Sequence, residues 1–452
     1  MLCEIGGVSG DIESLPFLEA ARQFRFEAGA KNTCFVHLTL VPYLKAAGEL
    51  KTKPSQQSVG QLRAIGIIPD ILVCRTEMTI PEEHRLKLAL FCNVRRECVI
   101  EEKDVTDSVY AVPRELRDQG LDARVLETLG LPVRPIRHTV WDTLVKKATQ
   151  AKRHCRIALV GKYVAVRDAY KSVHEALHHA GMAKNCKVEV VPIEAEELVS
   201  RAKSAKAAKE EEPSRTSRTS RESGCAALRA LRGFDGILVP GGFGSRGVEG
   251  KIAAIRYARE NGIPLLGICL GMQCAVIECA RELLGWKDAN STEFDPGTTH
   301  PVIDLMESQR GVTQKGGTMR LGAYPCVLRK GSLAAQLYKT TEYTEHTEND
   351  NALSCVSCIS WLKQKGALTI FERHRHRYEL AYDGEARRAL EAAGLRVSGV
   401  SPDGSLVEVV ELPDHPYFIA CQFHPEFKSR PTAPHPLFVG LVAAALAHKS
   451  SD

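Results

Sequence analysis

The chain has 452 residues, 44% of them hydrophobic and 25% charged, with a formal net charge of +5 at neutral pH. This length predicts two or three globular domains, and the small net charge gives no reason to expect a nucleic-acid partner. No stretch approaches the roughly 18 to 20 apolar residues of a membrane helix, and the start, MLCEIGGVSGDIES, lacks the pattern of a signal peptide. The fifteen cysteines are scattered and odd in number, so we expect free thiols, a cytoplasmic location and no membrane partner.

Strand-like and helix-like segments alternate along most of the chain. Residues 1–130 contain apolar runs at 34–44, 70–76 and 85–94, and a proline-containing stretch at 131–153 is predicted to be a linker. Beyond the linker, strand-like runs alternate with helix-like runs, in the order 156–163, 168–181, 187–193, 234–244, 250–261, 263–271 and 272–284. Such alternation predicts βαβ units with parallel sheets, and therefore two doubly wound α/β domains, at 1–130 and 154–448.

Two biased segments interrupt the second domain. Residues 203–224 are rich in charge and serine and are predicted to form a solvated insertion. A second insertion is predicted near 340–366, where Cys355 and Cys358 form an isolated C-x-x-C pair. A zinc site would need a second pair of ligands at suitable spacing, so we expect no metal there.

The sequence GICLGMQ at 267–273 places Cys269 between glycines at a strand-to-helix junction. This is the pattern of a nucleophile elbow with cysteine in place of serine, in which a sharp turn exposes the side chain at the edge of a sheet. The alternative interpretation is a buried structural cysteine between two packing glycines.

Two further motifs would complete a cysteine-based catalytic site. In CQFHPEF, at 421–427, an extended backbone would project His424 and Glu426 from one face, so that the carboxylate orients the imidazole toward Cys269. In VPGGFGSRG, at 239–247, consecutive glycines could turn N–H groups toward one point as an oxyanion hole. The alternatives are an exposed histidine beside an acid, and a plain glycine-rich or phosphate-binding turn.

The order GGxG, G-x-C-x-G and H-P-E resembles the class I glutamine amidotransferases over residues 154–448, which implies a flavodoxin-like domain. The sequences PGGFGSRGVEG, GICLGMQ, NSTEF, GGTMRLG, ERHRHRYE and CQFHPEF are similar to those of the CTP synthase family. By this resemblance, Cys269 is the nucleophile, His424 the base and Glu426 its orienting partner, with oxyanion donors near Gly241, Gly242 and Leu270.

The resemblance also implies a glutamine site. Its contacts fall on Gly242, Leu270, Gly271, Met272, Gln273, Glu293 and Arg377. Free glutamine carries an α-carboxylate and an α-ammonium group, which Arg377 and Glu293 could match in charge. Without the other motifs, ERHRHRYE would be interpreted as a basic strand that contacts phosphate or water.

Residues 1–130 resemble the later portion of the amidoligase domain of the same family, a Rossmann-like domain of the P-loop type. Nucleotide contacts implied by the resemblance are Asp11, Ile12 and Glu13 for CTP; Lys51, Thr52, Lys53, Pro54, Ser55, Gln56 and Lys87 for UTP; and Lys103, Asp104 and Val105 for ATP. Residues 51–56 are expected to lie on a loop. Glu4 matches a magnesium ligand.

The family resemblance therefore implies the ATP-dependent amination of UTP to CTP with ammonia from glutamine, with Mg²⁺ as cofactor, GTP as activator and a homotetramer or filament as the assembly. The sequence contains no G-x-x-x-x-G-K-[ST] phosphate loop, and a second magnesium carboxylate of the family is not found. We therefore expect that the chain lacks the N-terminal part of the amidoligase domain. A glutaminase-only fragment and a non-catalytic scaffold or filament subunit are the alternatives.

Overall fold

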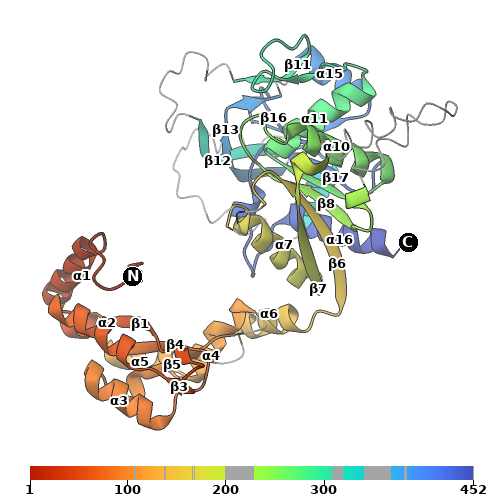
Figure 1. Cartoon of the computed structure of the whole chain (residues 1–452). Coiled ribbons are helices and arrows are strands. Elements are labelled where there is room, and N and C mark those ends of the chain that lie inside the picture. The colour runs from red at the N-terminus through yellow and green to blue at the C-terminus, as the bar shows by residue number, and fades with distance from the viewer. Residues whose placement is uncertain are drawn as a thin grey trace. The chain divides into compact units, whose positions relative to one another are not determined.

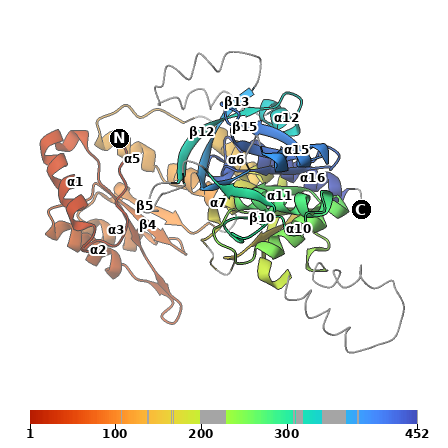
Figure 2. The ribbon, with the colours of Figure 1, turned by 90° about the horizontal axis from the view of Figure 1, so that it is seen from above.

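The computed structural model describes residues 1–105, 108–136, 139–164, 166, 168–198, 229–306, 309, 319–340, 368–380 and 384–450 (Figures 1 and 2). The chain divides into two compact units, Met1–Thr149 and Gln150–Asp452. The predicted insertions at 203–224 and 340–366, with Cys355 and Cys358, lie outside the described residues apart from Thr340. Within the described ranges, no helix is long and apolar enough to cross a membrane.

The first unit contains a three-stranded parallel sheet in the order β1-β4-β5. Its elements are α1 (Leu15–Ala28), η1 (Ala30–Asn32), β1 (Val36–Leu40), β2 (Tyr43–Leu44), β3 (Glu49–Leu50), α2 (Lys53–Ala64), β4 (Ile71–Thr76), α3 (Glu82–Cys92), η2 (Arg96–Cys98), β5 (Val99–Lys103), η3 (Val109–Ala111), α4 (Val112–Asp118), α5 (Leu121–Thr128) and α6 (Val140–Thr149). The central strand β4 sends alternate side chains to two small cores, since Leu72 packs with Leu88 and Ile71 with Ile100.

The stretch predicted as a linker at 131–153 contains a helix. Helix α6 buries Leu144 and Val145, and the Trp141 indole donates a hydrogen bond of 2.7 Å to the carbonyl of Tyr110. Arg117 forms an ion pair with Asp142 at 3.3 Å. These contacts attach the helix to the first unit, which extends to Thr149. The weak apolar pattern of this stretch did not predict the amphipathic helix.

The second unit contains a nine-stranded mixed sheet in the order β13-β12-β15-β16-β17-β9-β8-β6-β7. The five strands from β17 to β7 are parallel, and the four at the other end pair antiparallel. The bounds are β6 (Arg153–Gly161), β7 (Cys186–Glu194), β8 (Gly236–Val239), β9 (Leu265–Ile268), β12 (Arg320–Leu328), β13 (Leu368–His376), β15 (Arg396–Val400), β16 (Val407–Glu411) and β17 (Phe418–Cys421). Every residue of β8, β9 and β17 is buried, as expected for parallel strands covered on both faces.

Helices cover both faces of this sheet (Figure 1). Helices α10 and α11 contribute to one apolar core, and α7, α12 and α16 contribute to the core on the opposite face. The remaining elements are α7 (Lys171–Ala183), η4 (Arg229–Leu231), α10 (Val248–Asn261), α11 (Leu270–Leu283), β10 (Asn290–Ser291), β11 (Pro301–Leu305), α12 (Leu333–Thr340), β14 (Tyr378–Glu379), α15 (Glu385–Ala392), η6 (Pro425–Phe427) and α16 (Pro436–Lys449). The prediction of two α/β units is confirmed.

Helix α11 approaches strand β8 so closely that only glycine fits at the contact. A Cβ atom on Gly271 would lie 2.2 Å from the carbonyl oxygen of Val239. We expect Gly271→Ala to lower the free energy of unfolding of this unit by about 2 to 4 kcal/mol, measured by thermal or urea denaturation. The control is Gly60→Ala in α2, where a Cβ would meet nothing within 4 Å; it should change stability by less than about 1 kcal/mol. Equal stability of the two variants would contradict this packing.

Candidate active site

Three adjacent parallel strands, β8, β9 and β17, bring the predicted motifs together. Strand β9 pairs with β17 on one side, with Ile268 opposite Cys421, and with β8 on the other, with Gly267 opposite Val239. The segments that leave the carboxyl ends of these strands therefore meet at one edge of the sheet. Ligand and catalytic sites of open α/β sheets commonly lie at this edge.

Cys269 occupies the turn between β9 and α11 with φ of 51° and ψ of −103°. A positive φ is uncommon for a residue with a side chain and is typical of a strained functional turn. Strand β17 holds the turn in two ways. The backbone N–H of Cys269 donates a hydrogen bond of 2.7 Å to the carbonyl of Cys421. Gly267 lies so close to β17 that a Cβ on it would be 2.9 Å from the Cβ of Ala420, so only glycine fits there. Cys269 is only 3% exposed, so the predicted exposure of its side chain is wrong, because it packs among buried residues of the surrounding strands. The backbone geometry nevertheless has the form of a nucleophile elbow.

His424 and Glu426 form the expected pair, with 2.8 Å between His424 Nδ1 and Glu426 Oε1. The predicted extended conformation of this segment is wrong, because Pro425–Phe427 form a 3₁₀ helix. Proline suits the first position of a helical turn, since its fixed φ is helical and its missing N–H has no partner there. Burial lowers the pKa of His424, but interactions with Cys269 and with the Glu426 carboxylate outweigh burial and raise the pKa to about 10.

The glycine turn, defined as residues 240–244, lies against His424 and Cys269. A Cβ on Gly241 would lie 2.8 Å from Cε1 of His424 and 3.5 Å from Cβ of Cys269, so these three residues surround one point. Leu270 is the first residue of α11, where backbone N–H groups have no acceptor within the helix. The N–H groups of Gly241 and Leu270 are therefore candidate donors to an oxyanion beside Cys269.

Two glutamine side chains and one backbone carbonyl form contacts at or near Cys269 that the sequence did not predict. Gln422 Nε2 lies 3.6 Å from Cys269 Sγ, and Gln273 Nε2 lies 3.4 Å from Gln422 Oε1 and 2.9 Å from the carbonyl of Tyr378. The Arg375 carbonyl lies 3.9 Å from Cys269 Sγ. Gln422 stands inside the CQFHPEF motif, so its position beside His424 was available from the sequence, but its contact with Cys269 was not.

A cluster of buried charged residues lies behind the His424 segment. Arg320 contacts Glu408 at 2.7 Å and Glu379 at 3.2 Å, and His374 and His376 join the cluster through ring nitrogens 2.9 Å apart. Desolvation raises the pKa of Glu379 to about 8 and that of Glu408 to about 7, although Arg320 opposes both shifts. Burial and Arg320 lower the pKa of His376 to about 3. The histidines are therefore held neutral, and in the motif ERHRHRYE the edge strand alternates between buried Glu372, His374 and His376 and exposed Arg373 and Arg375.

The residues predicted to contact glutamine are divided between two environments. Leu270, Gly271, Met272 and Gln273 form the first turn of α11 and are buried, and the Met272 side chain packs in the apolar core. Glu293 accepts a hydrogen bond of 3.0 Å from the N–H of Gly244, and Arg377 donates to Gln309. Glu293 and Arg377 both act electrostatically on Tyr378, with opposite signs. An anion and a cation therefore both lie near Tyr378.

In the first unit, residues 51–56 do not form the predicted loop. Lys53 begins helix α2, and Pro54 lies in its first turn, where its restricted φ favours a helix start. Ser55 Oγ donates to the carbonyl of Leu40, and Gln56 Nε2 lies 3.1 Å from Thr52 Oγ1. Ser55 therefore attaches the start of the helix to β1, and Gln56 forms a hydrogen bond within the first turn of the helix.

The structure brings Lys51 and Lys87 together around Glu49, which the sequence did not single out. A hydrogen bond from Lys51 lowers the pKa of Glu49, and the charges of Lys51, His84 and Lys87 act in the same direction. Lys51 and Lys87 are separated along the chain and belong to different elements, so this juxtaposition is a result of tertiary structure.

The other predicted nucleotide contacts lie at ends of elements. Asp11 accepts a hydrogen bond of 2.8 Å from the N–H of Val8, in the turn that includes Ile12 and Glu13 before α1. Lys103 ends β5, and Asp104 pairs with Arg75 at 2.7 Å. Val105 follows them and Glu4 is exposed. In the part of the chain that the structure describes, no group of three or more His, Cys, Asp or Glu residues could hold a metal ion.

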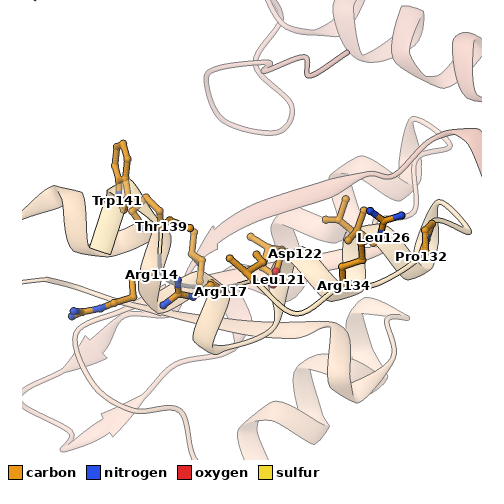
Figure 3. Close-up of a pocket in the computed structure, with 13 residues that line it drawn as sticks. Arg114, Arg117, Leu121, Asp122, Leu126, Pro132, Arg134, Thr139 and Trp141 are labelled. Carbon is orange, nitrogen blue, oxygen red and sulfur yellow. The ribbon is translucent and has the colours of Figure 1, made fainter. Parts of the chain in front are cut away.

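A cavity of about 770 Å³ lies within the first unit, between helices α4 and α5 and residues 132–141 (Figure 3). Apolar side chains such as Leu121 and Trp141 line it, together with Arg114 and Arg134. None of the predicted nucleotide contacts lines this cavity, so its location gives no support to their assignment.

Comparison with known proteins first defines the class of the second unit. The family model described as "Glutamine amidotransferase class-I" matches residues 165–444. The chain is also similar to the glutaminase domain of Trypanosoma brucei CTPS with bound acivicin, with 37% sequence identity and a TM-score of 0.50, over 64% of this chain and 93% of that one. The second unit is a class I glutamine amidotransferase domain of the flavodoxin-like type.

Comparisons over the whole chain define the family more narrowly. The model described as "CTP synthase N-terminus" matches residues 1–131. The chain is 66% identical to CTP synthase of Fibrobacter succinogenes over 452 residues, covering 100% of this chain and 71% of that protein. It is 50% identical to CTP synthase of Caldanaerobacter subterraneus subsp. tengcongensis over 446 residues, covering 99% of this chain and 73% of that protein. The chain belongs to the CTP synthase family.

The expectation that the N-terminal part of the amidoligase domain is lacking is not supported by these matches. The N-terminal family model matches from residue 1 to residue 131. The first unit therefore matches the N-terminal family of CTP synthases, although its sequence contains no phosphate loop of the usual pattern.

The contact between His424 and Glu426 predicts the alkaline limit of catalysis. With its raised pKa, His424 should lose its proton, and the enzyme its activity, as pH rises through about 10. Glu426→Gln removes a charge that raises this pKa, so the imidazolium should lose its proton at lower pH. We expect the alkaline limb of kcat/KM for glutamine hydrolysis to move to lower pH, and kcat/KM to fall roughly 10²- to 10⁴-fold.

The control is Glu189→Gln, which alters an exposed carboxylate on β7. This variant should keep the wild-type pH profile. An alkaline limb that stays in place in Glu426→Gln would contradict the role of the carboxylate.

Proposed function

We propose that this chain hydrolyses glutamine at Cys269 and uses the ammonia to convert UTP to CTP at the expense of ATP, as a CTP synthase. One observation carries the glutaminase half: Cys269 lies in a left-handed turn against the His424–Glu426 pair. The amidoligase half is supported by identity to relatives named CTP synthase over the full chain.

The geometry supports covalent catalysis by Cys269. The thiolate attacks the side-chain amide carbon of glutamine, and the carbonyl π electrons move to the oxygen, where the N–H groups of Gly241 and Leu270 would stabilise the charge. Collapse of this intermediate breaks the C–N bond, and the His424 imidazolium gives its proton to the departing ammonia. His424 then takes a proton from water as the water oxygen attacks the thioester. Collapse of the second tetrahedral intermediate breaks the C–S bond, restores the Cys269 thiolate beside the His424 imidazolium, and releases glutamate, whose new carboxyl group gives its proton to solvent. Glu426 holds the imidazole throughout.

Glutamine recognition is proposed to rest on charge complementarity. Glu293 would accept hydrogen bonds from the α-ammonium group, and Arg377 would pair with the α-carboxylate. The half-buried Gly242 and the buried backbone of residues 270–273 would surround the side chain of the substrate. The opposite effects of Glu293 and Arg377 on Tyr378 support a site with both signs of charge.

Nucleotide binding is proposed for the first unit. Lys51 and Lys87, which lie around Glu49, supply cations suited to the phosphates of UTP, and Lys103 to Val105 would contribute to ATP binding. Glu4 would contribute one carboxylate to Mg²⁺, an ion that usually takes one or two carboxylates together with substrate phosphates. Asp11 to Glu13 are proposed for CTP. Activation by GTP and assembly into tetramers or filaments rest on the family alone.

A cytoplasmic location is also proposed. The twelve cysteines among the described residues are free, which is consistent with a reducing compartment.

The decisive experiment uses the complete chain and measures two reactions separately. We expect the unmutated chain to hydrolyse glutamine and Cys269→Ala to lose this activity by at least about 10³-fold, because the nucleophile is removed. CTP formation from UTP, ATP and free ammonia should be equal in both proteins. Cys279→Ala, a buried cysteine on the same helix, should retain both activities.

The outcomes separate the alternatives. Glutamine hydrolysis without CTP formation from ammonia would identify a glutaminase-only protein. Absence of hydrolysis in the folded, unmutated chain would refute the proposed glutaminase and favour a scaffold.

A further inference from the structure

Two buried lysines lie beside the glycine turn, and the chemistry described above uses neither. Lys162 is 1% exposed and Lys251 is fully buried. Lysine is almost never fully buried without a partner, since removing an ammonium group from water is costly. Among the described residues neither lysine has an ion-pair partner within 4.0 Å, so their neighbours must compensate in another way.

Both lysines donate hydrogen bonds to backbone carbonyls of the glycine turn. Lys251 Nζ donates to the carbonyl of Pro240 at 2.9 Å. Lys162 Nζ donates to the carbonyls of Phe243 and Gly244. Three of the carbonyl groups in residues 240–244 are therefore fixed by ammonium groups from two different elements, the end of β6 and helix α10.

The direction of a carbonyl also fixes the direction of the next N–H group. The described chain contains no cis peptide bonds, and in a trans peptide unit the C=O of one residue and the N–H of the next point in opposite directions. The Phe243–Gly244 unit illustrates the consequence: Lys162 binds its carbonyl, and its N–H donates to Glu293 Oε1 at 3.0 Å.

The same rule applies to the Pro240–Gly241 peptide unit. Lys251 binds its carbonyl, so the Gly241 N–H points away from Lys251. Gly241 borders the catalytic pair, with a would-be Cβ 2.8 Å from His424 Cε1 and 3.5 Å from Cys269 Cβ. Among the described residues we find no hydrogen-bond acceptor for this N–H, which leaves it available to a ligand.

We propose that Lys251 is a positioning residue that orients the Gly241 N–H as an oxyanion donor, and that Lys162 positions Glu293 for the substrate ammonium group through Gly244. This inference rests on the proposed glutaminase function. The two lysines would thus have different roles, because Lys251 acts on the reacting centre and Lys162 acts on substrate recognition.

A buried ammonium group suits this task. A backbone amide in a glycine-rich turn has several orientations of similar energy, and a fixed cation in a low-dielectric interior favours one of them before substrate arrives. Burial lowers the pKa of Lys251 to about 8, so the fold retains this group despite a real cost.

The first test is Lys251→Met, which keeps a flexible side chain of similar length but removes the donor. We expect kcat for glutamine hydrolysis to fall roughly 10- to 100-fold, with KM for glutamine within about twofold of wild type, because the loss affects the transition state. Lys251→Gln, which keeps an N–H donor, should lose less. Lys187→Met, an exposed lysine on β7, should match wild type.

A second readout separates positioning from structural damage. Alkylation of Cys269 by iodoacetamide develops no tetrahedral oxyanion, so its rate should be the same in Lys251→Met and wild type. A parallel loss of alkylation and hydrolysis, or an unchanged kcat, would overturn the proposal. If Lys251→Met fails to fold, the same comparison in Lys251→Gln decides the matter.

Lys162→Met supplies the complementary test. We expect KM for glutamine to rise about tenfold or more, with a smaller change in kcat, because Glu293 loses its fixed contact with Gly244. Equal effects of the two lysine substitutions on kcat and on KM would contradict the division of roles. If the wild-type chain does not hydrolyse glutamine, the proposed function itself is wrong. If the wild-type chain is active and Lys251→Met is equally active, only the role of Lys251 is wrong.

Discussion

The left-handed turn at Cys269 is the constraint on which the rest of the site depends. A residue with a side chain costs about 1 to 3 kcal/mol in such a conformation, so the turn persists only because its surroundings hold it. Strand β17 accepts the Cys269 N–H through the carbonyl of Cys421, and the glycines at 267 and 271 allow β17 and β8 to approach within distances that no Cβ would permit. The strain is therefore a consequence of sheet packing, and it places the thiol at the edge where three strands end.

The interior around this turn contains many charged groups for a protein core. Arg320 binds Glu379 and Glu408, Lys162 and Lys251 bind carbonyls, and Glu426 binds His424. Each interaction is strengthened by the low local dielectric, and each fixes a backbone segment or a ring in one orientation. In the proposed mechanism, the donors around Cys269 are therefore already oriented when substrate binds.

Some features of the fold and the site followed directly from the sequence. The apolar runs predicted the parallel strands, because strands covered on both faces must be apolar at every position. The pairing of His424 with Glu426 was predicted, although the backbone between them is a 3₁₀ turn. The loop predicted for residues 51–56 is wrong, because a helix begins at Lys53, where proline favours the first turn. Residues 140–149, in the stretch predicted as a linker, form an amphipathic helix.

The sequence by itself identified the family and predicted a nucleophile and its base, because these depend on short motifs whose residues act through local geometry. The tertiary structure alone decided which residues support them. Lys251 and Pro240, and Gln422 and Cys269, meet only when the strands assemble, and burial changes their chemistry as much as proximity does. A lysine or glutamine is read from sequence as a surface residue, since its partner and its dielectric environment come from distant segments of the chain.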